Sequence, residues 1–241
     1  AMNKMDQEKY EIIPIYITKD RKWLTGEILK DIEIYQDLDL LKRYTKEVVL
    51  YEKNGRFVLQ TKGLFKRIVK EVDIMFPIVH GTNVEDGVLQ GYFTSIGVPF
   101  VGVDVYSAVV GQDKVFMKDI FQANGLSVPA YTWFYDVEYD EDQEKVLEKI
   151  KGALKFPMIV KPATLGSSVG IKKCDNQEEL MEAIQDAITY DKKIIVEELV
   201  QNLTEVNISV LGNYENQKLS AIEQVLASKD ILTYEDKYIG N

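Results

Sequence analysis

The stretch KPATLGSSVG, residues 161 to 170, places a lysine, two serines and two glycines where they could do chemistry. Glycines let backbone amides approach an anion closely, and serine hydroxyls add hydrogen-bond donors. Lys161 follows an apolar run and would reach into whatever site the loop covers. The Walker pattern G-x-x-x-x-G-K-[ST] does not occur, which excludes P-loop ATPases and GTPases. The pattern predicts a phosphate-covering loop; the alternative is an ordinary β-hairpin turn beside a surface lysine.

The same loop satisfies the G-x-S-x-G pattern of serine hydrolases. That pattern requires a strand before the serine, a helix after it, and an acid and a histidine later in the chain. Here the strand-like run GIKKC follows the loop, and the one histidine, His80, precedes Ser168. We therefore set the hydrolase interpretation aside.

The composition is that of a globular protein with a substantial core. Of the 241 residues, 46% are hydrophobic, and no apolar run approaches the ~18 residues that a membrane helix needs. The net charge of −10 is spread along the chain, which argues against non-specific nucleic-acid binding. It does not exclude a nucleotide, because one lysine ~4 Å from a phosphate is worth ~4 kcal/mol at an effective dielectric of ~20. The single cysteine, Cys174, excludes an internal disulfide and suggests the cytoplasm.

Strands and helices alternate along the chain, which predicts an α/β or mixed α+β fold. Asn54-Gly55 predicts a hairpin, and Asp113 and Gly125 are the expected caps of a helix. Asn176 is the expected N-cap of another. The run KRIVKEV predicts a short helix leading to a buried strand over 73–79. Further strands are expected at YEIIPIYI, AYTWF, FPMIVKP, GIKKC, KKIIVEELV, TEVNISVLGN and LSAIEQVLA.

Five segments in the same order closely resemble D-alanine–D-alanine ligases of the ATP-grasp superfamily. They are HGTNVEDGVLQGYFTSIGVPFVG, GQDKVFMK, FPMIVKPATLGSSVGIKK, IIVEELVQNLTEVNISVLGN and YEDKYI. The resemblance implies an ATP-grasp fold with an N-terminal α/β domain over 1–104, a central subdomain over 105–195, and the start of a C-terminal subdomain over 196–241. It also implies ATP-dependent joining of two D-alanines through an acyl phosphate, with ATP and Mg²⁺ as cofactors, for peptidoglycan precursors.

The resemblance assigns the phosphate-binding groups by matching positions. Phosphoryl transfer depends mainly on positioning and charge neutralisation, so cations must surround the phosphates. Lys114 and Lys161 match the lysines on the α- and β-phosphates, and Lys237 matches a third near the transferred group. Ser168 would face the transferred phosphate. Taken alone, Lys114 would be interpreted as a solvated lysine in the first turn of a helix.

On the nucleoside side, Glu198 matches the acid near the adenine amino group, and Glu205 matches the acceptor from the ribose hydroxyls. Glu197 and Glu198 must point to opposite faces of their strand. The choice of Glu198 rests on the family's spacing to Glu205.

On the substrate side, Ser167, Glu85 and Tyr238 match a hydrogen-bonded set that orients substrate. His80 corresponds to a histidine that borders the first D-alanine. Tyr234 and Tyr238 fall in a loop that closes over the site and excludes water. Because related D-lactate ligases tend to carry a histidine where Tyr238 stands, the tyrosine favours an amine acceptor. A D-serine or D-lactate acceptor is the alternative.

The resemblance implies further groups that have no matching positions here, among them the oxyanion arginine and the Mg²⁺ ligands, expected beyond Asn241. Since losing one oxyanion donor commonly costs ~10²–10³ in rate, we expect negligible ligase activity from this polypeptide alone. Val84 replaces a usual glycine and is expected to stiffen or shift the loop before Glu85. A non-catalytic nucleotide-binding fragment is the alternative of a different class. The family suggests a homodimer, and charge and composition indicate no nucleic-acid or membrane partner.

Overall fold

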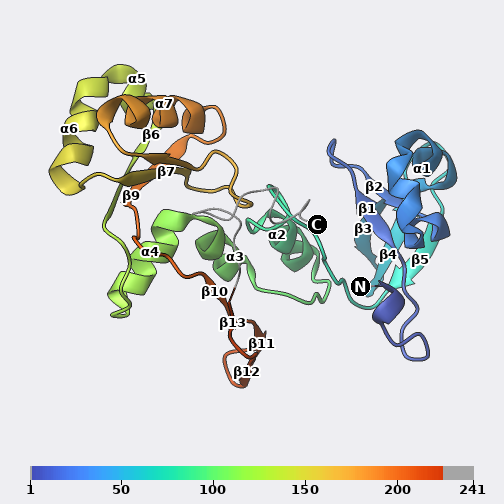
Figure 1. Cartoon of the computed structure of the whole chain (residues 1–241). Helices are drawn as coiled ribbons and strands as arrows, with labels where there is room; N and C mark the ends of the chain where they lie inside the picture. Colours follow the sequence, from blue (N-terminus) through green and yellow to red (C-terminus); the bar gives the residue numbers. More distant parts are fainter. Residues whose placement is uncertain (1, 225–241) are drawn as a thin grey trace. The chain divides into compact units, whose positions relative to one another are not determined.

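The structure, a computed structural model, describes residues 2–224, and its contacts divide the chain into two units (Figure 1). Unit 1 comprises the chain up to Ile78 together with Leu89–Val103. Unit 2 comprises Val79–Val88 and the chain from Asp104 onward. None of the helices in residues 2–224 is long and apolar enough to span a membrane.

Unit 1 is built on a five-stranded antiparallel sheet in which each strand pairs with the next along the chain. The hairpin predicted at Asn54-Gly55 is confirmed: both residues have positive φ (54° and 79°), and Lys53 pairs with Arg56 across the turn. The strands are β1 (Ile15–Ile17), β2 (Trp23–Thr25), β3 (Lys46–Lys53), β4 (Arg56–Thr61) and β5 (Ile68–Val72).

The helices of unit 1, apart from η1, which buries no side chain, pack apolar side chains against this sheet. Leu29, Ile34 and Leu41 form a buried cluster with Leu24 of β2, and Phe93 is buried at 6.3 Å from the Trp23 ring. The helices are the 3₁₀ segments η1 (Met2–Lys4), η2 (Glu27–Lys30) and η3 (Ile32–Gln36), and the α-helices α1 (Leu38–Tyr44) and α2 (Val88–Ile96).

The short helix predicted over KRIVKEV is wrong. Ile68–Val72 is strand β5, and its register with β4 runs from Phe57 opposite Val72 to Gln60 opposite Ile68. The β-branched side chains favour a pleated strand, and β4 offers an open edge with which to pair.

The buried strand predicted over 73–79 is also wrong. That run makes a single parallel bridge, between Met75 and Phe100, and Ile74, Phe76 and Ile78 are about half exposed. The run is apolar, as the sequence shows. Within unit 1, however, no neighbouring strand covers its side chains.

Unit 2 contains a four-stranded antiparallel sheet in the order β6-β9-β7-β8. All four of these strands were expected from the sequence. Because every pairing is antiparallel, the class is mixed α+β. The strands are β6 (Tyr131–Tyr135), β7 (Met158–Pro162), β8 (Lys172–Cys174) and β9 (Lys193–Glu198).

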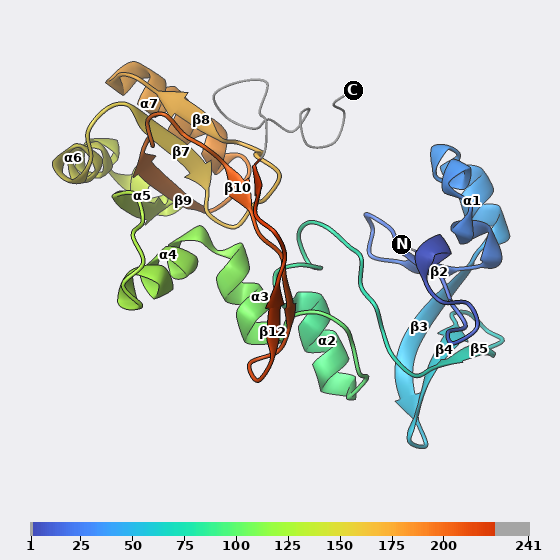
Figure 2. The same ribbon diagram turned by 60° about the horizontal axis from the view of Figure 1, so that its bottom comes forward.

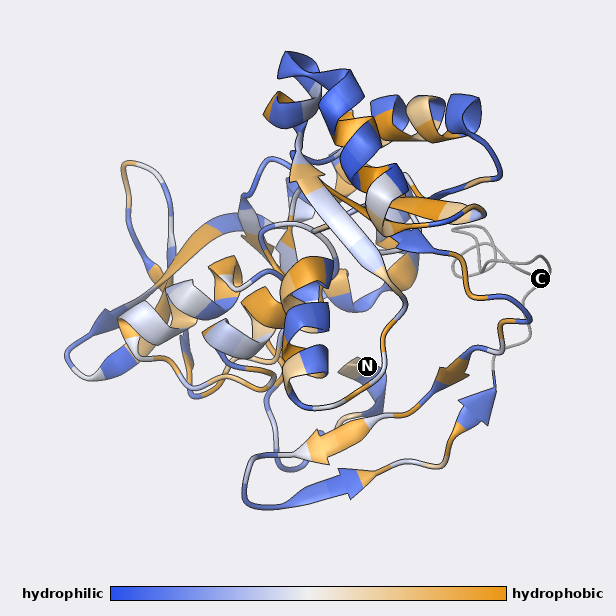
Figure 3. Cartoon of the chain, turned by 90° about the vertical axis from the view of Figure 1, so that its left-hand side faces the viewer, coloured by the Kyte–Doolittle hydropathy of each residue, from blue (hydrophilic) through white to orange (hydrophobic). Residues whose placement is uncertain are grey.

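One face of this sheet is covered by α5 (Asp136–Glu141), α6 (Gln143–Ala153) and α7 (Gln177–Ile188) (Figures 1 and 2). These helices alternate between hydrophilic and hydrophobic residues along their length (Figure 3), as amphipathic helices do. The N-cap predicted at Asn176 is confirmed, since its side chain accepts a hydrogen bond from the Glu179 amide. The buried core of this layer includes Phe134, Ile150, Val160, Ile184 and Val196.

The other face of the sheet meets α4 (Lys114–Ala123), which follows the unpredicted helix α3 (Val105–Gln112). Both predicted ends of α4 are confirmed. The Asp113 carboxylate accepts hydrogen bonds from the amides of Val115 and Phe116, and Gly125, with φ of 75°, closes a Schellman motif. Val115 of α4 packs with Ala163 and Ile195 on this face.

Two small antiparallel ribbons follow the sheet: β10 (Val206–Asn207) with β13 (Glu223–Gln224), and β11 (Val210–Gly212) with β12 (Gln217–Leu219). The boundary expected between residues 195 and 196 falls inside β9, all of which belongs to the four-stranded sheet.

Candidate functional site

The glycine–serine loop connects β7 to β8, which are adjacent antiparallel strands with Val160 opposite Lys172. The loop is therefore the connection of a hairpin. A hydrolase elbow needs a strand followed by a helix, so the geometry argues against a serine hydrolase site.

The two serines adopt a backbone conformation that L-residues rarely take. Ser167 and Ser168 have φ of 56° and 59°, and the Val169 amide donates to the Gly166 carbonyl at 3.2 Å to close the turn. Residues held there cost of order 1–3 kcal/mol each, and such strain clusters at functional sites. Gly170, with φ of 67°, is required by space as well, because a Cβ would lie 2.8 Å from Pro162 Cγ.

Lys114 reaches the base of this loop from the first turn of α4. Its amide donates to the Ala163 carbonyl at 3.0 Å. Its ammonium donates to the carbonyls of Pro162 (3.0 Å), Ala163 (3.3 Å) and Leu165. Burial lowers the pKa of Lys114 to about 8, and the neighbouring charge of Lys161 acts in the same direction. The interpretation of Lys114 as a solvated lysine is therefore wrong.

The same loop base is held by residues that sequence reasoning missed. The amide and hydroxyl of Thr164 both donate to the Asp191 carboxylate, at 2.7 and 2.9 Å, and the Gln112 side chain donates to the Thr164 carbonyl. Three parts of the chain, α3, α4 and the segment before β9, thus fix where the serine turn begins. No local spacing signals these contacts, because Thr164 and Asp191 are far apart in sequence.

Lys161 forms a charge pair with Glu197 of β9, with 2.9 Å between Nζ and Oε2. The strand register puts Ile195 opposite Lys161 and Glu197 opposite Ile159, so both charged side chains lie on the face that α4 covers. Glu197 is only 3% exposed. Burying a carboxylate carries a desolvation cost that nearby cations offset.

Glu198 lies on the opposite face of β9, toward α6 and α7, where it accepts from the Lys155 amide at 3.3 Å. The structure therefore does not bring Glu198 together with Lys161. Glu205 precedes β10 and is partly buried. Alternation along the strand showed that Glu197 and Glu198 diverge, but only the pairing of β9 with β7 shows that Glu197 faces the lysines.

A second buried pair lies beside the first: Lys193 Nζ is 2.8 Å from Asp113 Oδ2. The Lys193 ammonium also lies 4.1 Å from the centre of the Phe116 ring and 4.8 Å from that of Trp133. Across this face and the loop base, four lysines (Lys114, Lys118, Lys161, Lys193) face three carboxylates (Asp113, Asp191, Glu197), which leaves one positive charge in excess.

The substrate-side candidates His80 and Glu85 lie together. His80 Nδ1 is 3.4 Å from one Glu85 carboxylate oxygen, and the other oxygen accepts from the Gly81 amide at 2.6 Å. Asn83, with φ of 68°, takes the left-handed conformation in this segment, whereas the backbone of Val84 has a negative φ. The valine therefore fits here without left-handed strain.

Three further candidates, Tyr234, Lys237 and Tyr238, lie outside the described residues. Within residues 2–224 no group of three or more His, Cys, Asp or Glu side chains could hold a metal ion.

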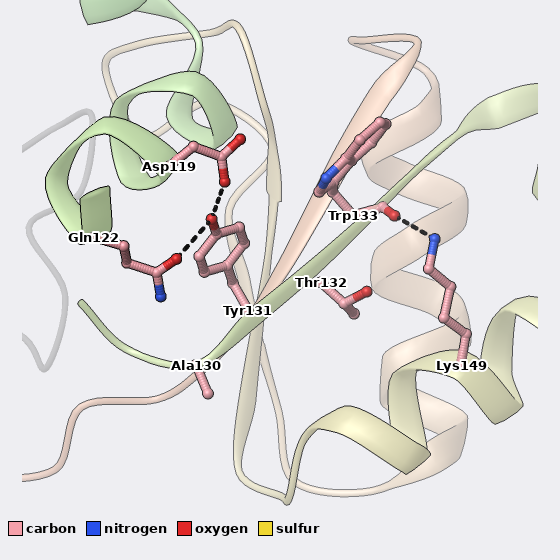
Figure 4. A pocket seen from close by; sticks show the side chains of 7 residues that line it. All are labelled: Asp119, Gln122, Ala130, Tyr131, Thr132, Trp133 and Lys149. Carbon is pink, nitrogen blue, oxygen red and sulfur yellow. Dashed lines mark hydrogen bonds between the residues drawn. The ribbon is translucent and has the colours of Figure 1, made fainter. Parts of the chain in front are cut away.

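A cavity of about 520 Å³ lies along the free edge of β6, between α4 and α6 (Figure 4). The Tyr131 hydroxyl donates to Asp119 and lies 3.4 Å from Gln122 Oε1, and Lys149 Nζ donates to the Trp133 carbonyl at 2.8 Å. Burial and Asp119 raise the pKa of Tyr131 to about 12. None of the predicted site residues lines this cavity.

Comparison with known proteins gives two matches that together cover nearly the whole chain. The family described as D-ala D-ala ligase N-terminus matches residues 1–103, and the one described as D-ala D-ala ligase C-terminus matches residues 120–241. The chain belongs to the D-alanine–D-alanine ligase family. Its resemblance to that family, drawn from five motifs, is confirmed.

Individual members of the D-alanine–D-alanine ligase family are similar along the whole chain. The D-alanine–D-alanine ligase of Bacillus cytotoxicus is 36% identical over 99% of this chain and 65% of its own length. That of Thermosipho africanus is 39% identical over 99% and 63%. The chain thus spans less than two thirds of these curated relatives.

Solved structures in the family confirm the ATP-grasp fold. The VanG D-Ala:D-Ser ligase of Enterococcus faecalis superposes with a TM-score of 0.80 at 30% identity, covering 98% of this chain and 66% of that one. The D-alanine–D-alanine ligase of Coxiella burnetii superposes with a TM-score of 0.77 at 27% identity, covering 93% and 64%.

Proposed function

We propose that the chain carries the nucleotide-phosphate site of a ligase that uses ATP to join two D-alanines into D-alanyl-D-alanine through an acyl phosphate. The observation that carries this proposal is the convergence of Lys114, Lys161 and the serine turn at one end of the unit 2 sheet. Membership of the D-alanine–D-alanine ligase family supports it.

The chemistry asks for positive charge around the phosphates and for exclusion of water from the acyl phosphate. In the proposed site, Lys161 and Lys114 neutralise phosphate charge, and Ser168 with its amide covers the transferred group. The excess positive charge of the lysine cluster fits a polyanion. ATP supplies the phosphoryl group; the residues of this chain bind and orient it.

For the nucleoside we propose Glu197, in place of Glu198, as the glutamate that faces the adenine amino group. Glu197 shares a sheet face with Lys161, whereas Glu198 does not. Glu205 is the proposed acceptor for the ribose hydroxyls.

The remaining assignments are proposed from the family resemblance alone. They include the orienting set of Glu85, Ser167 and Tyr238, the D-alanine contact of His80, the lid residues Tyr234 and Tyr238, and Lys237 near the transferred phosphate group. We also propose dependence on Mg²⁺, a homodimer, a cytoplasmic location for peptidoglycan-precursor synthesis, and a domain division near residue 104.

A second acceptor is favoured by one specific observation. The VanG structure that matches this chain is described as a D-Ala:D-Ser ligase. D-serine is therefore the alternative acceptor, and the amine chemistry of the reaction would be the same.

Calorimetric titration with ADP tests the proposed phosphate site. Wild type should bind, and Lys161→Ala should lose most of the heat, because it removes a phosphate cation and leaves Glu197 with one partner. Lys173→Ala is the matched control: Lys173 lies on the neighbouring strand β8 but is exposed and paired with Asp175. Equal heats from wild type and Lys161→Ala would contradict the proposal.

Phosphate release tests the acceptor. A complete version of the protein, extended to the length of its curated relatives, is assayed with ATP, Mg²⁺ and D-alanine, alone and with D-serine or D-lactate. Release with D-alanine alone is the expected result. Release that requires D-serine would favour the alternative acceptor.

A further inference from the structure

Lys118 is a buried lysine that no assignment above uses. It lies one turn after Lys114 on α4 and is 7% exposed. Its ammonium lies 3.5 Å from Glu197 Oε1 and 5.4 Å from the centre of the Tyr131 ring. Tyr131 is itself held by hydrogen bonds to Asp119 and Gln122 (Figure 4). Fixing a long charged side chain in this way costs conformational entropy and desolvation free energy, so its burial needs an explanation.

Glu197 links this lysine to the phosphate site. One carboxylate oxygen contacts Lys161 at 2.9 Å and the other contacts Lys118 at 3.5 Å. The second oxygen is buried and makes only this longer ion pair, with no hydrogen bond. Burial lowers the pKa of Lys118, and the charge of Glu197 opposes that shift.

The charges of Lys118, Lys161 and Glu197 together determine how much of the positive charge of Lys161 is available to a ligand. With both lysines protonated, the trio of Lys118, Lys161 and Glu197 carries one net positive charge. Without Lys118 the trio is neutral, and Glu197 alone would satisfy Lys161. An incoming phosphate would then compete with a buried carboxylate for that ammonium.

We propose that Lys118 is a positioning residue of the phosphate site: it neutralises Glu197 and so leaves the charge of Lys161 free to bind phosphate. This inference rests on the proposed function of that site. Lys118 acts through Glu197 and need not touch the ligand.

The experiment titrates inorganic pyrophosphate into each protein at pH 7 and low salt, so that only charge is probed and no nucleobase contact contributes. One unit of charge lost within the cluster should weaken pyrophosphate binding about tenfold in Lys118→Met. Adding Glu197→Gln to that variant restores the net charge and should recover affinity to within about threefold of wild type. Lys118→Arg should bind nearly as wild type does.

Lys172→Met is the matched control, because it removes one positive charge from an exposed position on β8 and should leave binding unchanged. Thermal unfolding of every variant is measured in parallel. A merely structural Lys118 would lower the melting temperature and the affinity together, and Glu197→Gln would not restore binding; that result overturns the inference. Unchanged binding in Lys118→Met overturns it as well.

If Lys118→Met does not fold, the single Glu197→Gln variant still tests the role of Lys118. It should bind pyrophosphate at least as tightly as wild type, and weaker binding overturns the inference. A wild type that binds neither pyrophosphate nor ADP removes the proposed function itself. Normal wild-type binding with no rescue removes only the role of Lys118.

Discussion

Binding of ADP should weaken as pH rises through the pKa of Lys114, since that lysine must be charged to hold phosphate. Burial lowers its pKa from 10.5 to about 8, with Lys161 acting in the same direction and with Asp191, Glu197 and Asp113 opposing it. A bound phosphate stabilises the charged form and returns the pKa toward its ordinary value. Binding near pH 8 should therefore take up protons.

The magnitude follows from the pKa of about 8. The protonated fraction of free Lys114 falls from roughly nine tenths at pH 7 to roughly one tenth at pH 9, so ADP affinity should drop about tenfold, ~1.4 kcal/mol. The phosphates of ADP do not titrate in this range, because a phosphate monoester has its second pKa near ~6. At pH 8, roughly half a proton should be taken up for each ADP bound.

Isothermal titration calorimetry in buffers of different ionisation enthalpy measures both the affinity and the proton uptake. Burial also lowers the pKa of Lys118, so the variant Lys114→Met is needed to isolate Lys114. It should bind more weakly at pH 7 and lose most of the pH dependence. An affinity that is constant from pH 7 to 9, or an unchanged pH profile in Lys114→Met, would refute the reasoning.

The stability of the unliganded protein should respond in the opposite sense. Between about pH 8 and 10.5 the unfolded chain binds more protons at Lys114 than the folded chain does. The contribution of Lys114 to the free energy of unfolding therefore rises with pH across that window. The difference in the free energy of unfolding between wild type and Lys114→Met, measured in urea at each pH, isolates this contribution.

Two stability predictions concern the scaffold of the site. Gly170→Ala should destabilise by about 1–3 kcal/mol in urea unfolding, since its Cβ would meet Pro162 Cγ at 2.8 Å. Gly166→Ala, which has open space, is the control and should stay within about 0.5 kcal/mol; equal losses in both would argue against the contact. Lys193→Met should cost about 3–5 kcal/mol because it leaves a buried Asp113 charge unpaired. Adding Asp113→Asn, which keeps an N-cap side chain, should restore most of that loss, and no recovery would show that the pair is not what Lys193 stabilises.

Much of the architecture could be predicted from short-range patterns. The hairpin at Asn54-Gly55 and both ends of α4 came out as expected, because a turn or a cap depends on chemistry within a few residues. The prediction for Ile68–Val72 was wrong because its apolar spacing also fits a short helix. Pairing with β4, a contact outside the segment, decided the outcome.

The same distinction between short-range pattern and long-range contact applies to the candidate site. The sequence by itself determined which residue types are present near the phosphates: Lys114, Lys161 and the serine loop, in the order of one family. Only the tertiary structure decided which of two adjacent glutamates faces Lys161, and that Lys118 is buried against the same carboxylate. The physical reason is that a strand's alternation fixes two opposite faces, while the register with a strand 36 residues away determines which face holds the charges.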